Sequence, residues 1–159
     1  MIGRPASFLF VSAFFFANLV AASPEQPQAP ELRSAGNCSL AIHVDGLRNQ
    51  KGKLGGAIFI SPDGWPEANE KSFRHGPTDI TGSTATLVFD HIPAGTYGVV
   101  VLHDENENHH LDRNMVGWPK EGFGFANNPH VGLVAPPFKD ALVHVTCPKT
   151  ETTIHIIYK

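Results

Sequence analysis

The chain has 159 residues and a formal net charge of −3, with 12 cationic and 15 anionic side chains interspersed along it. This length allows one domain of ordinary size. The sequence has no basic patch, which argues against nucleic acid or anionic lipid as a partner.

Residues 1–22 have the pattern of a secretory signal peptide. Arg4 precedes an apolar run from Phe8 to Val20, and small residues follow, which predicts cleavage after Ala22. The alternative is an uncleaved membrane anchor, but the run is short for a span of about 20 apolar residues. We therefore expect an exported protein with no transmembrane segment after cleavage.

Residues 23–36 are rich in proline and polar residues and lack an apolar period, which predicts a flexible linker. The folded domain is then residues 37–159, long enough for a single core. Its two cysteines, Cys38 and Cys147, lie near its two ends. After export an even number of cysteines favours a disulfide, and the alternative is two buried thiols.

Apolar residues in the domain recur with a period of two, which indicates strands, and no convincing helical period is present. A seventh strand is expected between Trp65 and Ile80. Turn-forming residues separate the strands, so the sequence predicts an all-β fold, a single β-sandwich of about seven strands. A bridge between Cys38 and Cys147 is expected in its core, joining the first strand to the penultimate one. The six clear strand segments are 38–46, 53–61, 85–92, 96–103, 141–147 and 152–159.

The run "HDENENHHLD", residues 103–112, follows an apolar strand and predicts a cation-binding loop. Calcium takes six to eight oxygen ligands, and alternate side chains of a tight loop can supply them. The spacing matches ligand positions one, three, five and nine of an EF-hand loop, with a backbone carbonyl at position seven. The predicted calcium ligands are Asp104, Asn106, Asn108, His110 (through its carbonyl) and Asp112.

Two departures from the EF-hand pattern predict weak calcium binding, with a dissociation constant of about 10⁻⁴–10⁻³ M. His109 replaces the sharp-turn glycine, and Met115 replaces the bidentate glutamate at position twelve. Glu105, Glu107 or the more distant Glu121 could add charge. The alternative is a solvated polar turn, which Asn and Asp also favour.

The stretch "VVVLHDENENHHLDRNMVGWPKEGFGFANN", followed by "PPFKDALVHV", resembles the DUF2141 family of secreted bacterial proteins of unknown function. Members carry a similar "hDeN.N..lD" loop, then "G.P.EgygFsn" and "P.f.dA". The resemblance covers residues 38–158. It implies a compact prealbumin-like or immunoglobulin-like sandwich in the bacterial envelope or periplasm, and it brings no established activity.

Residues 113–139 form a long connection, and connections longer than about 12–15 residues are usually functional or disordered. Its aromatic residues either pack over the sheet or form a platform for a sugar or peptide. His43, His144 and His155 fall on the outward faces of three strands, where a surface metal site competes with plain solvation. The candidate ligand-binding residues are Trp118, Glu121, Phe123 and Phe125.

We find no catalytic constellation, because Ser61, Ser72 and Ser83 lack a nucleophile-elbow context. The first hypothesis is therefore an exported, non-catalytic sandwich that binds calcium and acts in binding or envelope scaffolding. The second is a ligand-binding or hydrolytic protein that uses the 113–139 loop and nearby carboxylates. Its partner, an envelope protein or a glycan, is not identified by the sequence.

Overall fold

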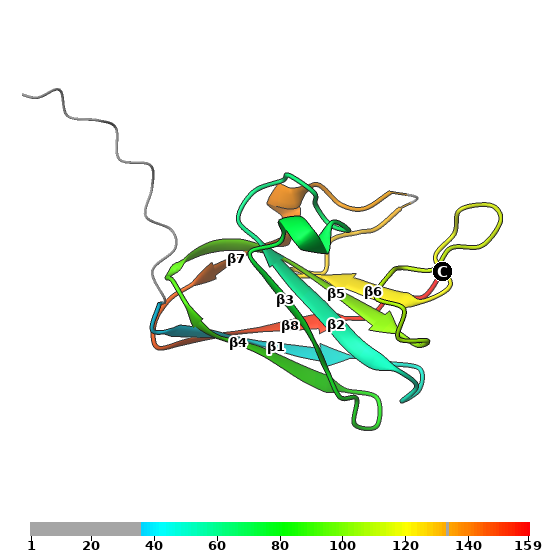
Figure 1. Ribbon diagram of the computed structural model, residues 1–159, viewed down its shortest axis with the longest axis horizontal. Helices are drawn as coiled ribbons and strands as arrows, with labels where there is room; N and C mark the ends of the chain where they lie inside the picture. Colours follow the sequence, from blue (N-terminus) through cyan, green and yellow to red (C-terminus); the bar gives the residue numbers. More distant parts are fainter. Residues whose placement is uncertain (1–35, 133) are drawn as a thin grey trace, which may run out of the picture. The chain divides into compact units, whose positions relative to one another are not determined.

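The computed structural model describes residues 36–132 and 134–159 (Figure 1). The predicted signal peptide, residues 1–22, and residues 23–35 of the predicted linker lie outside the described residues. The described residues form eight β-strands and two short 3-10 helices, η1 (Asn69–Lys71) and η2 (Phe138–Ala141). Neither of these helices has the length and apolar character needed to cross a bilayer.

The strands form two sheets. In the smaller sheet, β1 lies between β4, to which it is antiparallel, and β8, to which it is parallel. In the larger sheet, the order is β3-β2-β5-β6, and β7 pairs with the first half of β5. The strands are β1 (Cys38–Asp45), β2 (Lys53–Phe59), β3 (Arg74–Thr78), β4 (Ala85–Ile92), β5 (Gly95–Asp104), β6 (Gly122–Phe125), β7 (Leu142–Val145) and β8 (Lys149–His155).

The main core lies between the two sheets and confirms the predicted β-sandwich. Alternate residues of β4 are buried, as the period of two requires. Leu40 and Ile42 of β1 pack in one cluster with Leu54 and Ile58 of β2, and all four are fully buried. Burial of such side chains stabilises the fold by about 1.5–3 kcal/mol each.

A second apolar cluster covers the outer face of the larger sheet. Phe123 and Phe125 of β6 pack there with Val131 and Ala141. The intervening glycines face the other way, and a Cβ at Gly124 would lie only 2.5 Å from the Ile154 side chain. The prediction of one long connection over 113–139 was therefore wrong at 122–125, where "GFGF" forms strand β6.

The predicted disulfide between Cys38 and Cys147 is confirmed. The bridge was predicted to lie in the core. Cys38 is buried as predicted, but Cys147 is exposed. β7 ends at Val145, and the chain then turns, with the Thr150 hydroxyl bonded to the backbone N–H and carbonyl of Thr146. The bridge therefore closes one end of the sandwich.

Loss of this bridge should destabilise the domain strongly. The cysteines are 109 residues apart, and a cross-link over such a loop contributes about 4–5 kcal/mol in the chain-entropy model. The Cys38→Ala/Cys147→Ala double variant should therefore unfold at a much lower urea concentration than the oxidised protein. Reduced wild type is the control and should match the double variant. Equal midpoints for oxidised protein and double variant would contradict the expectation.

Candidate functional site

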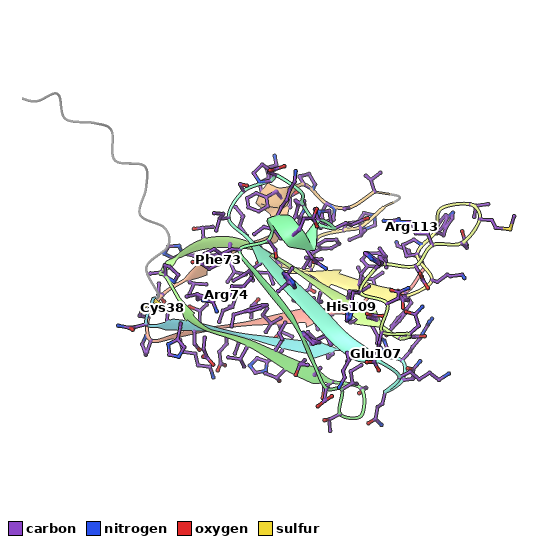
Figure 2. All side chains as sticks on the ribbon, viewed as in Figure 1. Cys38, Phe73, Arg74, Glu107, His109 and Arg113 are labelled. Carbon is purple, nitrogen blue, oxygen red and sulfur yellow. A yellow bond between two sulfur atoms is a disulfide. The ribbon has the colours of Figure 1, made fainter. Side chains whose placement is uncertain are left out.

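The predicted cation loop leaves the end of β5 and returns to the sheet at β6. Figure 2 shows Glu107 and His109 on this loop at the same end of the sandwich as Arg113, with Cys38 at the opposite end. Asp104 is the last residue of β5 and is buried, whereas residues 106–110 are exposed. The strand therefore ends by placing one buried carboxylate beneath an exposed turn.

The buried carboxylate of Asp104 stabilises the turn by accepting hydrogen bonds from its backbone. Its two oxygens accept the backbone N–H groups of Asn108 and His109, at 3.1 and 2.8 Å. The Asn106 side-chain oxygen also accepts from the Asn108 N–H at 3.2 Å, and the Asn108 oxygen accepts from the His110 N–H at 2.8 Å. These bonds let local polar side chains satisfy a backbone that has left the sheet.

Asp112 closes the loop from its far end. Its two carboxylate oxygens accept the side-chain amides of Asn106 and Asn108, at 2.9 and 3.0 Å. The predicted ligands Asp104, Asn106, Asn108 and Asp112 are thus brought into one hydrogen-bonded network rather than spread into solvent. His110 joins this network through its backbone, and its imidazole is exposed.

Glu121 joins the two ends of the loop from below. It is only 4% exposed, and its two oxygens accept the backbone N–H groups of Glu105 and Asp112, each at 3.0 Å. Sequence analysis assigned Glu121 to ligand binding and noted it only as distant extra charge for the loop. The structure places it directly against the loop, because β6 runs back along β5.

Two residues of the turn adopt left-handed backbone conformations. Glu107 has φ 59° and His109 has φ 65°. A residue with a Cβ pays a steric penalty of about 1–2 kcal/mol there, which glycine avoids. His109 thus takes the conformation that glycine supplies at the sixth position of EF-hand loops.

The oxygen atoms of this network fit calcium in their chemistry. Each Asn side-chain oxygen has two lone pairs and uses one for a backbone N–H. The carboxylates of Asp104, Asp112 and Glu121 supply hard oxygens with three formal negative charges. Across residues 36–132 and 134–159, no three His, Cys, Asp or Glu side chains form a metal-binding group, so a cation here would also need the Asn oxygens.

Arg48 binds Glu105, a loop carboxylate outside this network. Its Nε donates to Glu105 at 2.6 Å, and Asn49 donates to the same oxygen at 3.3 Å. The bond from Arg48 lowers the pKa of Glu105, against the opposing effect of partial burial. Sequence analysis did not single out Arg48, because its partner lies 57 residues away.

His103 fixes the start of the loop. The sequence pattern did not indicate this structural role. The side chain is fully buried, with Nδ1 at 2.7 Å from the Tyr158 hydroxyl and Nε2 at 2.9 Å from the Lys51 carbonyl. Because a carbonyl only accepts, Nε2 carries a proton. The bonds join β5, the 47–52 turn and the C-terminal segment at one point.

The candidate aromatic residues separate into buried and exposed sets. Phe123 and Phe125 are 7% and 4% exposed, which fits packing over the sheet, whereas Trp118 is 42% exposed. A groove of about 1280 Å³ lies beside Trp118 and Phe125 on the outer face of the larger sheet. The burial of Phe123 and Phe125 therefore favours the first hypothesis, and the groove beside Trp118 favours the second.

The three strand histidines do not come together. His43 and His155 lie on neighbouring strands β1 and β8, but His144 lies on β7 of the other sheet. His43 is 3.6 Å from Glu151, and His155 bonds Asp45. His144 bonds Thr96 instead, so the suggestion of one metal site from all three was wrong.

The Arg48–Glu105 pair should stabilise the protein in a pH-dependent way. The pKa of Glu105 is lowered from its ordinary value of 4.5, so the stabilisation is present above that value and is lost as pH falls through the folded-state pKa. Glu105→Gln should cost up to about 1 kcal/mol near neutral pH. Urea unfolding at about pH 7 and about pH 3 should show the gap closing in acid.

The matched control is Glu70→Gln, which removes an exposed carboxylate from η1 and should cost little at either pH. A gap between wild type and Glu105→Gln that widens in acid would contradict the assigned role.

Comparison with known proteins identifies the family to which this chain belongs. The sequence profile described as "Uncharacterized protein conserved in bacteria (DUF2141)" matches residues 42–154. No curated protein and no solved structure matches the chain, so the choice between a prealbumin-like and an immunoglobulin-like sandwich stays a prediction. The matched range spans both sheets and the whole 104–121 loop, and the chain belongs to the DUF2141 family of bacterial proteins.

Proposed function

We propose that this protein is an exported, non-catalytic binding or envelope-scaffolding domain whose 104–112 loop is stabilised by calcium. The network that links Asp104, Asn106, Asn108 and Asp112 carries the proposal. Its hydrogen bonds bring two carboxylates and two side-chain amides of the loop together. Calcium requires that gathering.

Calcium would replace hydrogen bonds that the network now makes with its own amides. The Asn106 and Asn108 nitrogens donate to Asp112, so the ion takes their place beside that carboxylate. Each Asn oxygen now accepts a backbone N–H group, so each amide would turn its second oxygen lone pair toward the ion. Glu121 supplies the additional charge that the sequence pattern lacked at position twelve.

The affinity expected for this loop is modest. His109 adopts a left-handed conformation at a steric cost, and no carboxylate occupies position 115. A dissociation constant of about 10⁻⁴–10⁻³ M suits proteins outside the cytoplasm, where calcium is abundant. The disulfide is compatible with such a compartment.

A second function, binding of a ligand on the outer face of the larger sheet, is supported by the groove beside Trp118. Typical ligand pockets occupy about 300–1000 Å³, so the groove is large enough. Asp104 and Glu107 also line it, which keeps a hydrolytic role within this second proposal. The two functions use adjacent surfaces and are compatible.

Calcium should raise the melting temperature of the protein by several degrees, and chelator should reverse the rise. Ligand at about 100 times its dissociation constant stabilises the folded state by about 2.7 kcal/mol. Asp112→Asn should remove most of the response, because it removes a carboxylate while retaining an oxygen. Asp90→Asn, which changes an exposed residue of β4, should respond as wild type does. An unchanged melting temperature in excess calcium would count against the site.

Export predicts a defined mature N-terminus. If residues 1–22 are removed, the protein recovered from outside the cytoplasm begins at Ser23. Intact-mass measurement of the recovered protein tests this directly, with cytoplasmic precursor as the control. A recovered protein that retains residues 1–22 would overturn cleavage and favour a membrane anchor.

A further inference from the structure

The groove on the outer face of the larger sheet owes its depth to small side chains. Its floor includes Gly55 and Ala57 of β2, Val100 of β5 and Phe125 of β6. A Cβ placed at Gly55 would meet only the Leu102 carbonyl oxygen, at 3.8 Å. The space above Gly55 is therefore open, and the floor is flat and largely apolar.

The walls of the groove come from segments that are distant in sequence. Glu67 precedes η1 on one side, and Arg113 and Trp118 belong to the loop after β5 on the other. An ion pair between Arg113 and Glu67 joins the two walls. Figure 2 labels Arg113 on this loop, on the side where β6 starts.

Trp118 is presented at the rim by a tightly bonded turn. The Asn114 side-chain oxygen accepts the backbone N–H groups of Val116 and Trp118, each at 3.0 Å. The Asn114 N–H in turn donates to the Trp118 carbonyl at 2.8 Å. These bonds fix the backbone that carries a 42% exposed indole, so an aromatic surface is held beside the groove.

The charges of the groove do not favour an anionic ligand. Among the described residues, the three cations that line it are already engaged. Lys53 pairs with Asp79, Arg113 pairs with Glu67, and Lys159 donates to the Val131 carbonyl. An anionic ligand would have to break one of these interactions, whereas a neutral ligand leaves them intact.

The floor also disfavours an extended peptide. Peptides add to sheets through unpaired backbone groups at an edge. Here β2 is paired on both sides, with β3 and β5, and β5 is paired with β2, β6 and β7. The central strands β2 and β5 therefore offer a ligand side-chain contact but no main-chain hydrogen bonding.

We propose that the groove binds a neutral oligosaccharide. This inference rests on the second proposed function and names its ligand class. A sugar ring has an apolar C–H face, which suits the flat floor and the Trp118 indole, and hydroxyl groups, which suit polar rim residues such as His110 and Glu107. A volume of about 1280 Å³ accommodates several linked rings rather than one.

The test is an NMR titration of isotope-labelled exported protein with cellohexaose, maltohexaose and N-acetylchitohexaose, in calcium buffer. At least one of these should shift the amide signals of Gly55 and Val100 and the Trp118 indole signal, and the shifts should saturate. Trp118→Ala should weaken binding about tenfold, because one aromatic contact contributes up to about 1.4 kcal/mol. Gly55→Leu should block binding by filling the floor.

Val88→Ala is the matched control, because Val88 is 46% exposed on β4 of the other sheet. It should bind as wild type does, and unchanged melting temperatures should show that both groove variants fold. Saturable shifts that Trp118→Ala and Gly55→Leu leave unaltered would overturn the proposed location.

Binding of a neutral, apolar fluorescent dye, Nile red, distinguishes failure of the ligand class from failure of the groove function. If the dye binds wild type but not Gly55→Leu, and no oligosaccharide binds, the ligand class is wrong and the groove function stands. If neither dye nor oligosaccharide binds, both are wrong.

Discussion

Strand β5 is paired along both edges and covered on both faces, and the rest of the domain is arranged around it. Its inward side chains, including Tyr97 and Val99, enter the main core, while Val100 lies under the second cluster. No other strand of the described residues pairs with three neighbours. A strand in that position has almost no freedom to shift, so the loop at its end starts from a fixed point.

The loop after β5 is organised by acidic groups acting as hydrogen-bond acceptors. Asp104 and Glu121 are buried, and each accepts two backbone N–H groups. Buried carboxylates are costly unless they are bonded in this way. The same preorganised oxygens form a candidate centre for a divalent cation. The atoms that accept the backbone N–H groups of the loop are therefore also the proposed cation ligands.

One part of the outer face of the larger sheet is covered by aromatic side chains, and another part is open as the groove. Trp65 contacts Phe59, Phe125 and Phe138, with ring centroids 5.4 to 5.7 Å apart, and closes part of that face. Beyond this cluster, the small residues of β2 leave the groove open. Its outer wall includes the segment 109–119, which begins within the 104–112 loop. The loop and the groove therefore share residues, including Asp104 and Glu107.

The sequence by itself determined the strand pattern, the single cysteine pair and the 104–112 run, because alternation and local spacing are properties of neighbouring residues. Tertiary structure decided the rest. "GFGF" became β6 because its glycines fit against Ile154 and Tyr158. Glu121 reached the loop because β6 pairs with β5, and His144 was separated from His43 because their strands joined different sheets. Alternation reports which side chains are buried, whereas strand order is set by long-range pairing that no local pattern encodes.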